Sequence, residues 1–187
     1  MNSNGTNPIE KLETGIVGFD AIANGGLPRG RTTLVAGTAG SAKTVFAAQF
    51  LVRGITDFDE SGVFVTFEET PDDIRKNLLA FGWNVPELES AGQWAFVDVS
   101  PNADDEAVVS GDFDLGGLLA RIEHAIKKVG AKRVSVDSLG AIFGKLMDDG
   151  RLGKKVKKGF YRYDTKKKEV DDNVYSLLSI TKNSVLA

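Results

Sequence analysis

Cysteine is absent from this sequence, and histidine occurs only once, at position 124. Without cysteine the chain has no disulfides, no thiolate metal site and no cysteine nucleophile. A single histidine also excludes a histidine-rich metal site and leaves only one residue on which a Ser-His-Asp arrangement could be built. Because His124 falls within a helical pattern beside charged residues, a place on a helix surface is favoured over a catalytic role.

Long apolar runs are missing as well. No stretch approaches the ~20 apolar residues of a membrane span, and the first eight residues are too polar for a secretory signal. The sequence therefore predicts a cytoplasmic protein with no membrane partner. With 187 residues, 42% of them hydrophobic, a single soluble domain can bury roughly two thirds of its unfolded surface without help from disulfides or metal.

Basic residues are scarce in the first 144 positions and abundant afterwards. Residues 1–144 carry 12 Lys and Arg against 20 Asp and Glu, whereas residues 145–187 carry 11 against 6, and the net charge of the chain is −3. So abrupt a change indicates a basic tail with its own partner or two segments of different origin. The tail lysines favour a solvated surface over a nucleic-acid site, because no nucleic-acid motif accompanies them.

Short apolar runs alternate with longer amphipathic ones, which is typical of βα units. The expected strands are Thr32–Ala36, Gly62–Phe67, Trp94–Asp98 and Arg133–Asp137. The expected helices are Lys43–Arg53, a helix beginning at Pro71 with Thr70 as its N-cap, and a helix from about Leu115 that ends at Gly130. Apolar strands separated by helices predict an α/β fold, with a mainly parallel sheet covered on both faces.

A glycine-rich turn follows the first expected strand and opens the first expected helix. It agrees with the phosphate-loop pattern G-x-x-x-x-G-K-[ST] at every position except the sixth. The candidate nucleotide-binding residues are Gly37, Thr38, Ala39, Gly40, Ser41, Ala42, Lys43 and Thr44. Such a loop turns backbone N–H groups toward an anion at a helix N-terminus. Lys43 would then reach the phosphates of ATP, and the Thr44 hydroxyl would hold Mg²⁺.

The exception is Ala42, which stands where glycine is usual. A methyl group is tolerated there at negative φ and is costly at positive φ. We expect negative φ, because residue 42 would lie in the first turn of the helix.

Acidic residues end two of the expected strands. Asp137 closes the last strand, where a carboxylate can hold Mg²⁺ through water, although an isolated aspartate at a strand end more often caps the next helix. Glu68 and Glu69 follow the second strand. Ligands of such sheets bind outside the carboxyl ends of the strands, so one of the pair could polarise water that attacks the γ-phosphate. The alternative is a pair of solvated acids at a helix N-terminus.

Together with the leading segment, these motifs resemble the first ATPase domain of the KaiC family of circadian clock proteins. The resemblance runs from about residue 13 to residue 143. It rests on Thr14–Asp20, Gly25–Arg31, Gly37–Thr44, Gly62–Pro71, Phe81–Trp83 and Arg133–Ser138. It implies a RecA-like P-loop NTPase core, ATP and Mg²⁺ as ligands, a hexameric ring with nucleotide between subunits, and a clock-protein partner. It also implies that Glu68 and Glu69 are paired catalytic glutamates and that Asp137 is the Walker B acid.

The resemblance stops after the Walker B strand, so we expect a truncated core. Residues from about 149 to 178 instead resemble a C-terminal stretch of 3-hydroxyacyl-CoA dehydrogenases, without that family's catalytic residues. The expected organisation is therefore a disordered segment 1–13, an ATPase core 14–143 and an unrelated basic segment 144–187, which is a mosaic chain. We expect the segment 158–180 to pack on the open edge of the sheet or to extend it.

Three functions remain open from sequence alone. The first is a Mg²⁺-dependent ATPase of the KaiC type, weakened because basic residues that contact the neighbour's γ-phosphate would be missing. The second is a nucleotide-binding assembly module without turnover. The third is a non-functional mosaic. The motifs support nucleotide binding more firmly than hydrolysis.

Overall fold

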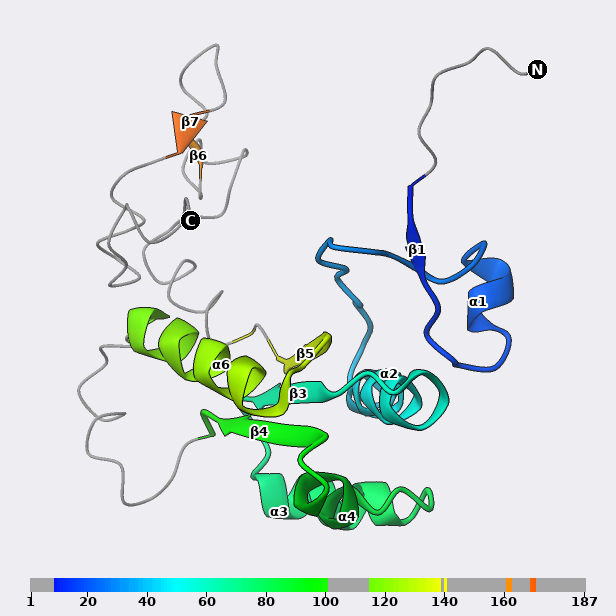
Figure 1. Ribbon diagram of the computed structural model, residues 1–187. Coiled ribbons are helices and arrows are strands. Elements are labelled where there is room, and N and C mark those ends of the chain that lie inside the picture. The colour runs from blue at the N-terminus through cyan, green and yellow to red at the C-terminus, as the bar shows by residue number, and fades with distance from the viewer. Residues whose placement is uncertain (1–8, 101–114, 139, 141–160, 163–168, 171–187) are drawn as a thin grey trace.

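Figure 1 shows the computed structural model of the chain, which describes residues 9–100, 115–138, 140, 161–162 and 169–170. A three-stranded sheet lies between helices. The strands of this sheet are β3 (Gly62–Thr66), β4 (Trp94–Asp98) and β5 (Arg133–Asp137). The helices are α1 (Phe19–Ile22), α2 (Lys43–Phe58), α3 (Pro71–Leu79), α4 (Val85–Ser90) and α6 (Leu115–Val129).

The central sheet is parallel, in the order β4-β3-β5. Gly62 at the start of β3 pairs with Trp94 on one side and with Arg133 on the other, so the three strands begin level and end level. The buried central strand β3 reads Gly-Val-Phe-Val-Thr, the near-continuous apolar run that a strand covered on both faces requires.

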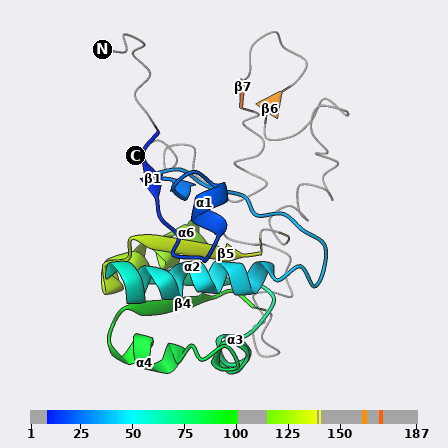
Figure 2. The same ribbon diagram turned by 90° about the vertical axis from the view of Figure 1, so that its right-hand side faces the viewer.

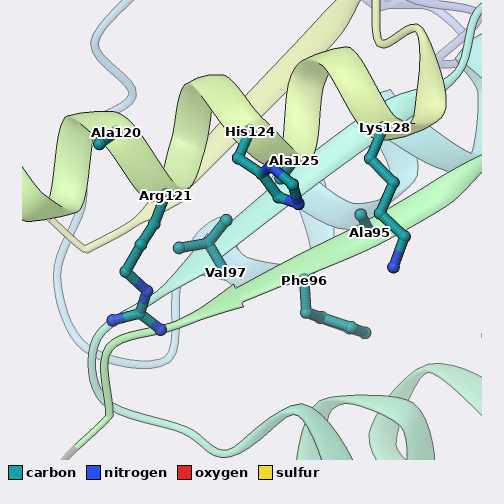
Figure 3. Close-up of a pocket in the computed structure, with 8 residues that line it drawn as sticks. All are labelled: Ala95, Phe96, Val97, Ala120, Arg121, His124, Ala125 and Lys128. Carbon is teal, nitrogen blue, oxygen red and sulfur yellow. The ribbon is translucent and has the colours of Figure 1, made fainter.

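Helix α6 covers one face of the sheet, over β3 and β4. Its apolar positions recur at helical spacing, and Val97 and Ala125 lie between the helix and β4 (Figure 3). The buried members of this cluster are Val63, Val65, Phe67, Val97, Leu118 and Ala125. The helix ends at Val129, and Gly130 after it adopts a φ of 62°, a conformation that suits glycine at the end of a helix.

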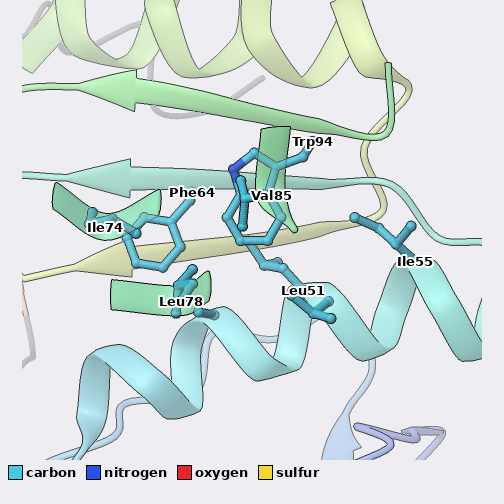
Figure 4. Packing of buried hydrophobic residues seen from close by; sticks show 9 residues of the cluster. Leu51, Ile55, Phe64, Ile74, Leu78, Val85 and Trp94 are labelled. Atoms are coloured by element: carbon cyan, nitrogen blue, oxygen red, sulfur yellow. The ribbon is translucent and has the colours of Figure 1, made fainter. Parts of the chain in front are cut away.

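The opposite face is covered by α2, α3 and α4, with α2 in front of the sheet in Figure 2. Phe64 and Trp94 stack with ring centroids 5.9 Å apart in the middle of this second cluster (Figure 4). Its other buried members are Ala48, Leu51, Val52, Ile55, Ile74, Leu78 and Val85. Trp94 is therefore a core residue, and burying a side chain of this size contributes about 1.5–3 kcal/mol or more.

The helix predicted after the second strand begins as expected. Pro71 occupies its first position, and the Thr70 hydroxyl accepts a hydrogen bond from the Asp73 N–H. Helix α2 extends five residues beyond its predicted end at Arg53, to Phe58, because Ile55 continues the buried face formed by Leu51 and Val52. The short helix α4 and the strands β1 (Lys11–Leu12) and β2 (Leu27–Pro28) carry too little periodicity to be predicted.

Buried Arg133 fastens the N-terminal segment to the sheet. Its side chain is 1% exposed and donates hydrogen bonds to Glu60 Oε2 at 2.7 Å and to the carbonyl oxygens of Glu13 and Phe50. Its guanidinium also stacks on the ring of Phe50, 4.7 Å from the centroid. A Cβ at Gly54 would collide with this side chain, so the glycine in α2 makes room for the arginine.

The strand predicted at Thr32–Ala36 is wrong. These residues run without strand pairing on the surface, with Leu34 71% and Val35 44% exposed. The stretch has the composition of a strand, but a strand forms only against a partner. In the described part of the chain, β5 pairs on one side only, with β3, and no strand lies between its outer edge and residues 32–36.

Among the described residues no strand pairs with the outer edge of β5, as the sequence predicted. The expectation that both faces would be covered fails at this strand, because Val134 and Val136, on the face that carries α6, are 39% and 40% exposed. In the tail, β6 (Tyr161–Arg162) and β7 (Glu169–Val170) pair with each other and form a separate sheet. They do not extend the central sheet, and the rest of the segment 158–180 lies outside the described residues.

Described structure begins close to the N-terminus. Residues 1–8 lie outside the described part, whereas Lys11 and Leu12 form β1, so described structure begins before the sequence-based boundary at residue 13. None of the helices in the described ranges is long and apolar enough to cross a membrane.

Candidate functional site

The segments that carry the predicted acidic residues leave the sheet at one edge. Because the strands are parallel and in register, Thr66 of β3 pairs with Asp137 of β5, and the chain segments that follow both strands leave the same edge. Ser138 then donates a hydrogen bond to Glu68 Oε1 at 2.6 Å. The structure therefore brings the Glu68 and Asp137 segments together.

The glycine-rich loop lies at the same edge because α2 is anchored on β5. The Ser135 hydroxyl donates to the carbonyl oxygen of Ala47 at 2.9 Å, and Arg133 at the start of β5 donates to that of Phe50, so α2 runs back along β5 and its first residues lie toward the end of the strand. Residues 37–42 are exposed and lead into the helix at Lys43.

The ammonium group of Lys43 makes hydrogen bonds to the loop that precedes it. Nζ donates to the carbonyl oxygens of Gly37 at 3.1 Å and Thr38 at 2.9 Å, and to the Ser41 hydroxyl at 3.4 Å. All three partners belong to the loop, so the positive charge sits inside the turn where the sequence predicted a phosphate contact.

The expectation of negative φ at Ala42 is wrong. Ala42 is the N-cap of α2 and adopts φ 61 and ψ 28, a left-handed conformation, and Gly40 has φ 77. The residue lies just before the helix rather than in its first turn. An alanine pays about 1–2 kcal/mol for this conformation, whereas glycine adopts it freely.

The start of α2 suits an anion. No side chain caps the helix, and its first turn holds no acidic residue, so the backbone N–H groups and the positive end of the helix dipole are left for another acceptor. A Cβ at Gly37 would collide with the Ser41 hydroxyl, so a larger residue there would displace the Ser41 side chain. These features fit the phosphates of a nucleotide.

The two glutamates have different surroundings. Glu68 is exposed and accepts the hydrogen bond from Ser138. Glu69 is half-buried, and its Oε2 accepts from the amide of Asn77 in α3 at 3.0 Å, while its backbone carbonyl accepts from the Thr66 hydroxyl. The carboxylate of Glu69 is therefore turned toward α3, and that of Glu68 toward the end of β5.

Sequence reasoning missed the two partners of these glutamates. Ser138 directly follows Asp137, so a strand-end hydroxyl could have been noted. Asn77 lies eight residues after Glu69 in another element, and no local spacing connects the two.

A protein cage for a metal ion is absent from the described residues, which contain no group of three or more His, Asp or Glu side chains arranged to hold one. Mg²⁺ does not require such a cage, since it commonly keeps several waters and binds one or two protein oxygens together with substrate phosphates. The oxygens of Thr44 and Asp137 fit that donor set.

Comparison with known proteins identifies the family of this chain. The family model of the KaiC ATPases matches residues 12–169. The chain belongs to the KaiC family. Its core is thus a RecA-like ATPase domain, in line with the parallel sheet and flanking helices. The match also runs past residue 143, where the resemblance was expected to stop, and nothing in the comparisons shows the expected dehydrogenase-like segment.

Curated relatives are similar over most of this chain. The circadian clock protein KaiC3 of Synechocystis sp. is 60% identical over 147 residues, which is 79% of this chain and 29% of the relative. The circadian clock oscillator proteins KaiC of Thermostichus vulcanus and Synechococcus elongatus are 56% and 53% identical over 135 residues, 72% of this chain. The chain spans little more than a quarter of the length of these relatives.

Proposed function

We propose that this chain binds ATP with Mg²⁺ at the loop Gly37–Thr44 and hydrolyses it weakly, as a nucleotide-binding domain of a KaiC-type clock protein. The observation that carries the proposal is the convergence of an exposed loop, a helix N-terminus without an acidic first turn, and the Glu68–Ser138 pair at one edge of the sheet. Backbone N–H groups of the loop would hold the phosphates, and Lys43 would exchange its loop carbonyls for phosphate oxygens.

Each carboxylate has a role in this proposal. The oxygens of Thr44 and Asp137 would hold Mg²⁺, which would offset charge on the phosphates. Glu68, exposed and oriented by Ser138, accepts the proton of the attacking water. The water oxygen then bonds to the γ-phosphorus as the bond to the bridging oxygen breaks, so that ADP leaves with that electron pair and inorganic phosphate forms. Glu69, tied to Asn77, supports the position of its neighbour.

Nucleotide binding is tested with Lys43→Ala. We expect ATP affinity in the presence of Mg²⁺ to fall by about 1.5–3 kcal/mol, the contribution of a charge-assisted hydrogen bond, as measured by isothermal titration calorimetry. Lys76→Ala is the matched control, because Lys76 is an exposed cation on α3 paired with Asp73. Equal affinity in the Lys43→Ala variant and the parent would refute the assignment of the loop.

Turnover is tested separately with Glu68→Gln, Glu69→Gln and the double variant. If Glu68 accepts the proton, its replacement lowers kcat by about 10²–10⁴ while ATP affinity stays nearly constant. Glu69→Gln, which keeps a hydrogen bond to Asn77 possible, has the smaller effect. Turnover is measured as the rate of phosphate release. An unchanged rate in the double variant would show that neither glutamate takes part in hydrolysis.

The second candidate function is nucleotide-dependent assembly without turnover. It is favoured by one observation, namely that the only cation hydrogen-bonded to the loop, within the described ranges, is Lys43. A ring in which nucleotide lies between subunits would supply further cations from a neighbour. Oligomeric mass with and without ATP, measured beside phosphate release, separates the two: ATP-dependent assembly with no phosphate release supports the second function.

A further inference from the structure

A basic groove lies at the opposite edge of the sheet from β5, between helix α6 and strand β4. Arg121, His124 and Lys128 project from α6 toward the strand, and Ala95 and Val97 lie beneath them (Figure 3). All three basic residues are exposed. The groove has a volume of about 430 Å³, and none of the residues that line it is acidic.

The strand below this groove is a free edge. In the described part of the chain β4 pairs only with β3. The carbonyl oxygen of Gln93 accepts from Gly62, and the N–H of Val99 donates to Thr66, so the odd-numbered residues of this strand turn their backbone groups toward β3. In a parallel ladder the alternate residues, Trp94 and Phe96 among them, then point their N–H and C=O groups outward.

One outward-facing carbonyl already has a partner. The oxygen of Asp98 accepts a hydrogen bond from Nη2 of Arg121 at 2.5 Å. Helix α6 thus contacts the edge of the strand at its carboxyl end. The outward groups of Trp94 and Phe96 pair with no strand in the described part of the chain and could accept an added one.

The spacing of the basic residues suits an extended chain. Positions 121, 124 and 128 lie on one side of α6 and span about 10 Å at 1.5 Å per residue. Alternate residues of a strand lie about 6.6–6.8 Å apart, so two or three side chains on one face of an added strand would pass under the three basic groups. The other face of that strand would lie beside the half-buried ring of Phe96.

We propose that this groove docks an extended acidic segment of a partner protein, which adds to β4 as a further strand. The acidic side chains of that segment alternate with apolar ones, the acids facing Arg121, His124 and Lys128 and the apolar side chains facing Phe96. Backbone hydrogen bonds to Trp94 and Phe96 give affinity, and the basic row selects for acidic residues. This surface lies outside the proposed nucleotide site.

The test uses the whole chain and a labelled ten-residue peptide of alternating Glu and Val, with binding followed by fluorescence anisotropy. Lys128→Glu should weaken binding roughly tenfold, because an attraction is replaced by a repulsion. Lys127→Glu is the matched control: it makes the same change in charge one position away, at a lysine that pairs with Glu123 and does not line the groove. Both lysines are exposed, and circular dichroism verifies that each variant folds.

Two altered peptides separate strand addition from simple charge attraction. A peptide with Gln in place of Glu should bind weakly, and a peptide with Pro in place of Val, which keeps the charge but cannot pair as a strand, should not bind. Hydrogen exchange at the amides of Trp94 and Phe96 should slow when the Glu-Val peptide is bound. Equal weakening by both lysine variants, full binding of the proline peptide, or displacement of the peptide by a single-stranded oligonucleotide that binds more tightly would each overturn the proposal.

Discussion

At the scale of single residues, Ala42 is the strained residue of the candidate site, because its backbone is left-handed. The left-handed backbone that the turn imposes just before α2 has to be adopted by a residue with a Cβ. The sequence showed the departure from glycine but not the sign of φ, because φ depends on where the helix begins. The strain lies directly beside Lys43, the residue on which nucleotide binding is proposed to depend.

Replacing Ala42 by glycine should therefore stabilise the protein. We expect the free energy of unfolding to rise by about 0.5–1 kcal/mol, since the relief of left-handed strain exceeds the added freedom of glycine in the unfolded chain. Ala39→Gly is the control, because Ala39 is in the same loop without positive φ and should be neutral or destabilising. Urea unfolding of the three proteins measures the difference, and no gain in Ala42→Gly would contradict the argument.

Arg133 is a second residue whose importance only the structure reveals. Arg133→Met keeps much of the volume but removes the donor to Glu60 and to three backbone carbonyls, so we expect the free energy of unfolding to fall by about 3–5 kcal/mol. Arg29 also approaches Glu60, at 3.9 Å, but its side chain is 45% exposed, and Arg29→Met should cost less than about 1 kcal/mol. The free energies of unfolding of the two variants are compared by thermal and urea unfolding. Similar losses in both variants would show that burial of the arginine does not matter.

At the scale of elements, the turn between β1 and α1 depends on Asp20. Its carboxylate accepts hydrogen bonds from the N–H and hydroxyl of Thr14 and from the N–H of Gly15, at 2.8 to 3.1 Å. Burial opposes ionisation, but these hydrogen bonds, together with the charge of Arg133, hold the pKa of Asp20 below its ordinary value of 3.8.

Asp20→Asn should therefore destabilise the protein at neutral pH, by about 1–3 kcal/mol. Because the pKa of the folded state is lowered, this stabilisation is complete above pH 3.8 and is lost as the pH falls through the folded-state pKa. The difference in free energy of unfolding between the parent and Asp20→Asn, measured by urea unfolding, should become smaller below that pH. Asp57→Asn, at an exposed pair with Arg53, is the control and should change stability by less than about 1 kcal/mol. A difference in stability that does not change with pH would contradict the role given to the Asp20 carboxylate.

The elements that sequence predicted correctly share one property: each carries its own periodic pattern or its own cap. Strand β3 is apolar throughout, α6 repeats its apolar positions, and α3 has Thr70 and Pro71 at its start. The segment 32–36 is equally apolar, but its state depends on a neighbour that local sequence does not reveal.

At the scale of the whole molecule, the sheet is covered at its centre, and within the described ranges neither of its edges carries a further strand. Strand β3 is buried from Gly62 to Thr66, between α6 on one face and α2 on the other. The outer edges belong to β4 and β5, where alternate backbone groups point away from β3.

Hydrogen exchange should follow this arrangement. Amides of Phe64 and Val65, in the central strand, should exchange slowest, and those of Val134 and Val136, which point to the free edge of β5, should exchange faster. Amides of residues 32–36 should exchange fastest of the three groups. Exchange followed by mass spectrometry or NMR measures this order, and strong protection at 32–36 would mean that the segment has a strand partner.

The α/β class, the central strands and the main helices follow from periodicity and capping in the sequence alone, and the motif predicts that the loop Gly37–Thr44 binds phosphate. Tertiary structure decided that Thr32–Ala36 is unpaired, that Ala42 is left-handed, that Arg133 is buried among backbone carbonyls, and that Glu68 and Glu69 face different partners. These features depend on contacts between residues far apart in the chain. A strand, a buried charge and the direction of a carboxylate are all stabilised by groups that lie on other elements, and no local pattern specifies which groups those are.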